Sequence, residues 1–223
     1  MLFWRRKDSH DGVIRFSDEG RGLAIYRYGS DGKDLLLLPG TRIEVAEGQA
    51  IAFFAGSELA DVFDRGSYLL TPENFPMLAE KRPFRLRPIR PIKAELYFIN
   101  LDPITERKWA TRSPALVREN GQNFRVRAYG TYDFQVTDVI PFLLEVFRKR
   151  GFQTSYEIVS FLPTLIAGAF AATVSELKMP VAEIINHPWE ISSLVCGKAN
   201  QSAKSLGLEI TNVMIEGASL PDE

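Results

Sequence analysis

The spacing of apolar residues changes along the chain, and this change constrains the fold more than any other feature. Up to about residue 136, apolar residues come in short runs separated by turns rich in glycine, which is typical of β-strands. The longest run, 124–136, alternates strictly at first, with Phe124, Val126 and Ala128 on one face. From Asp138 onward the spacing is helical. We therefore expect an α+β protein with an N-terminal antiparallel β unit followed by a mixed α/β part.

The β-type segments are short and evenly spaced. We expect strands at 23–28, 35–38, 42–46, 50–55, 59–63, 68–70, 94–99, 105–110 and 124–136. Glu47-Gly48-Gln49 stands between two of them and predicts a hairpin. Gly130 predicts a bulge or a close backbone approach within the longest strand.

The second half predicts about three helices and a closing strand. The first helix, 138–150, ends in cations followed by Gly151, and Thr154 and Glu157 form a capping-box pattern for the next. Pro163 should kink or split that second helix. The last helix begins at His187-Pro188 and ends at Gly207, before a strand at 208–215. We place the domain division between residues 1–80 and 81–223.

Residues 158–175 form a stretch of 18 residues without a charge, which just reaches the length of a candidate transmembrane helix. The segment is nevertheless rich in small and hydroxyl residues and contains Pro163. Its flanks are Glu157 and Glu176 rather than basic anchors. We interpret it as a buried, close-packed helix.

Opposite blocks of charge cancel to a net charge of −1. Residues 1–80 carry a net −4, residues 81–150 a net +8 and residues 151–223 a net −5. The basic block is densest at 81–93, which has six positive charges, no negative ones and three prolines. Arg85 and Arg87 alternate with apolar residues, as on a strand with one wet face.

This basic stretch has three possible roles. Arg85, Arg87 and Arg90 could contact phosphate, in lipid headgroups or in nucleic acid. The stretch could be an edge strand that charge and proline protect from self-pairing. It could also meet an acidic part of a second subunit.

The apolar part of the N-terminus is too short for a signal peptide, and its positive charges follow the apolar part, whereas in a signal peptide they precede it. It could form a small membrane foot, with aromatic residues at headgroup depth and basic residues on anionic lipid. The alternative is a mobile terminus or an aromatic pair packed on the domain. The residues of this membrane-contact prediction are Phe3, Trp4, Arg5, Arg6 and Lys7.

No catalytic or cofactor motif is present: the P-loop, dinucleotide, nucleophile-elbow and zinc-protease patterns all fail. Two histidines and one cysteine are too few for a Cys/His zinc site in one chain. Cys196 cannot form an internal disulfide and is expected to be an inert apolar residue. Asp61 and Asp64 are expected to be solvated near a turn. We expect no catalytic residue, no cofactor and no metal.

Several segments, in order, resemble the SPFH (stomatin–prohibitin–flotillin) superfamily, and within it a bacterial subfamily labelled virion core protein-like. The resemblance extends from about residue 13 to about residue 217. Its glycines, Gly48, Gly56 and Gly66, fit tight turns. The segments that carry it are 43–57, 61–78, Glu95-Leu96-Tyr97-Phe98-Ile99-Asn100, Lys108-Trp109-Ala110-Thr111, 127–134 and Gly207-Leu208-Glu209-Ile210.

The resemblance implies an SPFH-type α/β subdomain in the second half and a non-enzymatic scaffold. It implies a protein that is cytoplasmic, peripheral to the inner membrane and homo-oligomeric. Its partners would be anionic membrane lipid and a membrane-stress protein of the phage-shock protein A type. Many relatives carry a C-terminal zinc ribbon or a further helical segment. This sequence ends at Pro221-Asp222-Glu223 without a Cys pair, so such a segment is either absent from the protein or truncated. The alternative function is a single-stranded nucleic-acid-binding module that uses 81–93 and Phe84, although nucleic acid is the less favoured partner.

Overall fold

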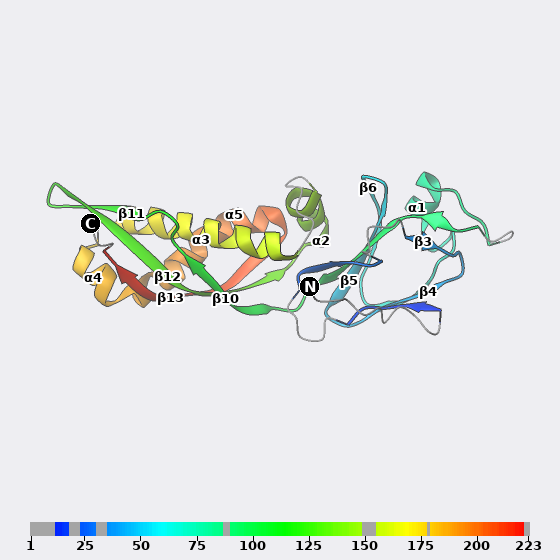
Figure 1. Cartoon of the computed structure of the whole chain (residues 1–223), viewed down its shortest axis with the longest axis horizontal. Coiled ribbons are helices and arrows are strands. Elements are labelled where there is room, and N and C mark those ends of the chain that lie inside the picture. The colour runs from blue at the N-terminus through cyan, green and yellow to red at the C-terminus, as the bar shows by residue number, and fades with distance from the viewer. Residues whose placement is uncertain are drawn as a thin grey trace, which may run out of the picture. The chain divides into compact units, whose positions relative to one another are not determined.

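The computed structural model describes residues 12–17, 23–29, 35–86, 90–148, 155–177 and 179–220. The chain folds as two compact units, Met1–Leu101 and Asp102–Glu223 (Figure 1). Within the described residues every strand pair lies inside one unit. The first unit includes residues 81–101, which the sequence-based division assigned to the second domain, because β9 (Glu95–Asn100) pairs with β5 (Gln49–Ala55).

The first unit is built from short strands and one short helix. Its sheets have the orders β1-β4-β7, β2-β9-β5-β6 and β3-β8. All pairs are antiparallel except β1 with β4, which is parallel. Its other elements are β1 (Val13–Ile14), β2 (Ile25–Arg27), β3 (Leu36–Leu37), β4 (Arg42–Val45), β6 (Glu58–Phe63), β7 (Gly66–Leu69), α1 (Pro76–Lys81) and β8 (Ile92–Lys93).

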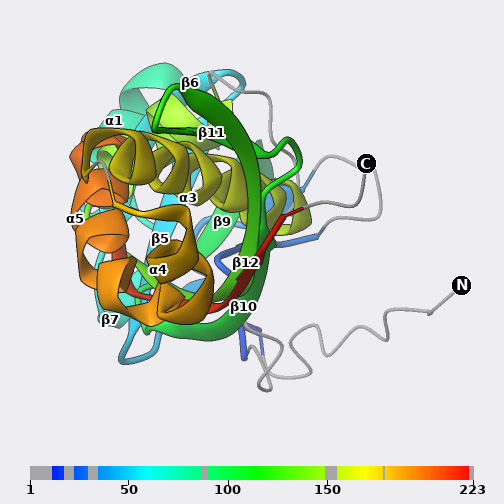
Figure 2. The same cartoon turned by 90° about the vertical axis from the view of Figure 1, so that its left-hand side faces the viewer.

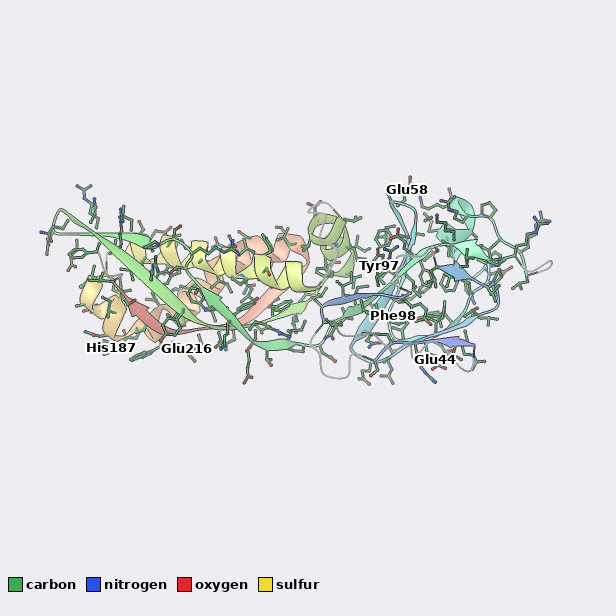
Figure 3. The ribbon with its side chains drawn as sticks, viewed as in Figure 1. Glu44, Glu58, Tyr97, Phe98, His187 and Glu216 are labelled. Carbon is green, nitrogen blue, oxygen red and sulfur yellow. The ribbon has the colours of Figure 1, made fainter. Side chains whose placement is uncertain are left out.

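Aromatic side chains fill the centre of the first unit. Phe53 on β5 and Phe75 before α1 are fully buried, with ring centroids 4.9 Å apart in an edge-to-face arrangement. Phe98 on β9 is buried in the same core (Figure 3). β5 is buried on both faces, so its sequence is a continuous apolar run rather than an alternating one.

The hairpin that Glu47-Gly48-Gln49 predicts does not form. β4 pairs with β1 and β7, whereas β5 pairs with β6 and β9, so the two strands belong to different sheets. Gly48 still turns the chain with a φ of 71°, and the Gln49 amide donates to the Ala46 carbonyl. The prediction of a turn at Gly48 is therefore confirmed, but the two strands that the turn joins enter different sheets.

The second unit is one antiparallel sheet with helices on one of its faces. β12 (Gln122–Val136) pairs with β10 (Ile104–Ala110), β11 (Ala115–Glu119) and β13 (Leu208–Ser219). The helical elements of this unit are α2 (Val139–Pro141), the π-helix η1 (Phe142–Arg148), α3 (Ser155–Leu177), α4 (Val181–Asn186), the 3₁₀ turn η2 (Pro188–Ile191), α5 (Ser192–Ala203) and the 3₁₀ turn η3 (Lys204–Leu206). Figure 2 shows α3, α4 and α5 on the same face of this sheet.

The core of the second unit follows from the period of β12. Val126, Ala128, Gly130, Tyr132 and Phe134 are buried under the helices, while the residues that alternate with them are more exposed. From α3 come Leu162, Ile166, Ala169, Phe170, Thr173 and Val174, which lie on one helical face and are all buried. The α+β fold that the sequence predicts is thus confirmed.

Several helix boundaries differ from those expected. The helix expected at 138–150 begins as α2 and continues as a π-helix from Phe142. Pro163 does not split α3, which runs unbroken from Ser155 to Leu177. The helix expected at His187 begins as a 3₁₀ turn, and α5 proper starts at Ser192.

Candidate interaction surfaces

The basic stretch 81–93 is only partly a strand. Lys81 ends α1, and only Ile92–Lys93 forms a strand, paired with β3. Between them, described residues 82–86 and 90–91 have no strand pairing. The prediction that Arg85 lies on a strand with one wet face is therefore wrong, because Pro83 and Pro91 have no amide hydrogen to donate to a neighbouring strand.

The charges of this stretch are not equivalent. Lys81 forms an ion pair with Glu58 at the start of β6 (Figure 3). This hydrogen bond raises the pKa of Lys81 and lowers the pKa of Glu58. Arg85 and Arg90 are exposed and have no ion pair within the described residues. Arg87 and the membrane-foot residues Phe3, Trp4, Arg5, Arg6 and Lys7 lie outside the described residues.

Phe84 packs inside the first unit. Its side chain is 8% exposed and belongs to the same core as Phe75 and Leu78. A ring in this position offers no face on which a nucleotide base could stack. The nucleic-acid alternative thereby loses the aromatic residue on which it depended.

Exposed leucines accompany the end of the basic stretch. Leu36 on β3 lies opposite Lys93 on β8, and its side chain is 62% exposed. Leu38, just beyond β3, is 51% exposed. The intervening Leu37 is buried, because successive strand residues point to opposite faces. An apolar pair thus stands beside the exposed Lys93, a combination that suits the boundary between lipid headgroups and acyl chains.

The other candidate groups have structural roles. Asp61 is 8% exposed, and its two carboxylate oxygens accept hydrogen bonds from the Met77 and Leu78 amides at 3.3 and 2.7 Å. The expectation that Asp61 is solvated is therefore wrong, since this carboxylate satisfies the free amides at the start of α1. Asp64 is exposed, as expected. The Cys196 thiol donates to the Ile210 carbonyl, and burial raises its pKa.

By length and composition alone, α3 is long and apolar enough to cross a membrane. Residues 160–177 have a mean hydropathy of 1.4, and 33% of them are buried within the protein. A core helix of a soluble protein meets the same criterion, and the buried face of α3 packs on β10, β11 and α5. Within the described residues no cluster of three or more His, Cys, Asp or Glu side chains could hold a metal ion.

One surface was missed by the sequence analysis. β11 and β12 form a hairpin whose turn residues, Asn120 and Gly121, have φ values of 49° and 81°. The dipeptide Asn-Gly is the strongest local signal for such a turn, and it was available in the sequence. The hairpin presents Arg118, Arg125 and Arg127 on exposed positions.

A family model for the SPFH domain–Band 7 family matches residues 25–223, nearly the whole chain. The chain belongs to the SPFH domain–Band 7 family. Members of this family are in general membrane-associated and serve as non-enzymatic scaffolds. The SPFH chain is also 29% identical over 107 residues to the uncharacterized protein YdjI of Bacillus subtilis (strain 168). That match covers 47% of the SPFH chain and 33% of YdjI.

Proposed function

We propose that this SPFH protein is a non-enzymatic scaffold at the cytoplasmic face of the membrane. It lies peripherally on anionic lipid, assembles with itself and recruits a membrane-stress protein of the phage-shock protein A type. Within the superfamily, the ordered motifs favour the virion core protein-like subfamily. The family's general association with membranes supports the proposed location at a membrane. The surface of the first unit supports peripheral contact with lipid.

The observation that carries the proposal is the pair of exposed leucines on and just beyond β3, the strand that pairs with the end of the basic stretch. Leu36 and Leu38 are both more than half exposed, and β3 is paired with the strand that ends the basic stretch. Full burial of a leucine contributes about 1.5–3 kcal/mol, and each cation near an anionic surface about 1 kcal/mol. Two leucines with Arg85 and Arg90 therefore suffice for reversible binding. The proposed N-terminal foot, residues 3–7, would add to it.

Vesicle flotation tests this mode of contact. The full chain should float with vesicles that contain anionic lipid but not with neutral ones, and physiological salt should weaken the binding relative to low salt. Leu36→Ser with Leu38→Ser, and separately Arg85→Gln with Arg90→Gln, should each lower the fraction that floats. Arg65→Gln with Lys204→Gln removes two exposed charges elsewhere and should leave flotation unchanged.

Failure to float under any condition would remove direct lipid contact from the proposal. Flotation that persists in the leucine and arginine variants would instead assign the contact to another part of the chain. Recruitment is tested separately, by asking whether the purified chain holds a phage-shock protein A homologue on vesicles that do not bind that homologue alone.

A further inference from the structure

The outer face of the β11–β12 hairpin carries unpaired positive charge. Arg125 and Arg127 are two residues apart on β12 and point to the same face, away from the helices. Arg118 lies on the facing strand, in register with Asn123. None of the three arginines has an ion pair within the described residues, although five other ion pairs form there. Like charges that lie close together on a sheet lower the stability of the fold, so strand pairing alone does not explain why three arginines lie here.

Two large exposed side chains lie among these arginines. Leu116 is directly opposite Arg125 and is 57% exposed. Tyr129 follows Arg127 on the same face and is 56% exposed, with its ring over Gly217 of β13. We name the five residues Leu116, Arg118, Arg125, Arg127 and Tyr129 the basic sheet face. Arginine and tyrosine are enriched at the centre of protein interfaces.

The helical side of the same unit carries a surface of opposite charge. Glu183 on α4 and Glu190 in η2 are exposed and have no ion pair within the described part of the chain. Between and beyond them, Trp189 is 54% exposed and Leu194 is 51% exposed. We name Glu183, Trp189, Glu190 and Leu194 the acidic helix end. Figure 3 marks His187, which leads from α4 into this turn.

The two surfaces have complementary compositions, with three arginines on one and two glutamates on the other. Each has one exposed aromatic ring and one exposed leucine, and their charges are opposite. They lie on different sides of the unit, because α4 and α5 cover the face of the sheet that β12 turns away from the arginines (Figure 2). One copy therefore cannot satisfy both surfaces by itself. A two-fold dimer would have to bring both surfaces of each copy into one interface, which their placement on different sides of the unit opposes.

We infer that the basic sheet face of one copy binds the acidic helix end of the next. This contact is heterologous, so it repeats and yields a ring or a filament rather than a closed dimer. The inference rests on the self-assembly included in the proposed function and assigns that assembly to the second unit. Lipid contact, by contrast, was argued from the first unit.

Charge reversal with mixing tests the contact. One protein carries Arg118→Glu, Arg125→Glu and Arg127→Glu, and the other carries Glu183→Lys and Glu190→Lys. Each alone should assemble at least about tenfold more weakly than the wild type by analytical ultracentrifugation. An equimolar mixture should recover assembly. The first protein keeps its acidic helix end and the second keeps its basic sheet face, and their two reversed surfaces are again opposite in charge, so every contact along the assembly can form. A protein with Arg42→Glu, Arg65→Glu and Lys204→Glu has the same charge change as the first and should assemble like the wild type.

The outcomes separate this inference from the proposed function. A wild-type chain that stays monomeric at all concentrations overturns the inference, as does assembly that survives both reversals. Loss of assembly without recovery on mixing overturns it too, because a heterologous contact must be restored by the mixture. Flotation of the same proteins is measured separately. Flotation without assembly would support lipid binding and contradict the subunit contact. Assembly without flotation would support the subunit contact and contradict lipid binding. Thermal melting followed by circular dichroism shows whether each variant is folded.

Discussion

At Gly130 the pairing of β12 with β13 leaves no room for a side chain. A Cβ atom at this position would lie 1.9 Å from the Met214 carbonyl oxygen, which belongs to the backbone and cannot rotate away. The register shifts here, because Tyr129 is opposite Gly217 and Gly130 is opposite Ile215, so the extra residue lies on β13. Of the two features expected at Gly130, the close backbone approach is confirmed. The glycine is thus required by space rather than by its φ angle.

Gly130→Ala should lower the free energy of unfolding by about 3 kcal/mol, because the strands must separate to admit the methyl group. Urea unfolding measures the change. Gly168→Ala in α3 is the matched control: nothing lies within 4 Å of its Cβ position, and alanine favours a helix over glycine by about 1 kcal/mol. Equal effects of the two substitutions would contradict the close approach at Gly130.

Asp61→Ala should destabilise the protein by roughly 1–3 kcal/mol, since it leaves the Met77 and Leu78 amides without their acceptor. Burial raises the pKa of Asp61 in the native state. The native state then holds this proton more tightly than the unfolded chain does. The contribution of this group to stability is therefore full below its unfolded pKa and declines as pH rises through the native pKa.

Asp61→Asn should remove that part of the pH dependence while keeping one acceptor oxygen. Urea unfolding at several pH values between about 4 and 7 compares it with the wild type. A variant whose stability changes with pH as the wild type does would show that another group titrates in this range.

At the scale of elements, local patterns predicted most strands but not their partners. β5, β9 and β12 lie within a residue or two of where apolar runs placed them. The hairpin at Gly48 failed, because a turn signal does not specify whether the chain returns beside itself or enters a second sheet. α1 and α4 have only six residues each and were too short to produce a helical period.

The sequence predicted the exposed charges of the candidate surfaces but not their exposed apolar residues, because the exposure of an apolar residue depends on which elements pack together. Arg85 and Arg90 proved exposed, as a charge-rich stretch with prolines suggests. The exposure of Leu36 depends on which face of β3 the core covers, and a run of four leucines, 35–38, does not reveal that. The acidic helix end likewise depends on how α4 packs, which no local pattern specifies.

Pro163→Ala should raise the free energy of unfolding by about 1–3 kcal/mol. Proline lacks the amide hydrogen that would bond the Val159 carbonyl, and α3 continues on both sides of it. Differential scanning calorimetry would register a higher melting temperature. The exposed neighbour Thr164→Ala should give a smaller increase, and a loss of stability in Pro163→Ala would show that the ring packs where alanine leaves a cavity.

For the whole molecule, the division at Leu101 and Asp102 separates two complete sets of strand pairs. Each unit has its own core of large apolar side chains, built around Phe53 in one and Phe134 in the other. A chain of this length divided into units of about 100 residues gives each enough volume to fold alone.

Residues 1–101 and 102–223, produced separately, should therefore each unfold cooperatively. Circular dichroism and dispersed amide signals in NMR spectra would show this. The first fragment should retain the lipid binding that depends on Leu36 and Leu38, and the second should retain assembly through the basic sheet face. A fragment that stays unfolded would show that its core needs the other unit.

We expect β12 to resist bending more than any other element of the second unit. It is paired along its whole length, with β11 near the turn, with β10 further on, and with β13 over most of its course. Its 15 residues correspond to a rod about 45 Å long. Arg125 and Arg127 lie toward one end, and the other end leads directly through Asp138 into α2 and the π-helix. A load applied to the hairpin by a neighbouring subunit would travel down this rod with little bending, and the first element able to yield is the irregular helix at its far end.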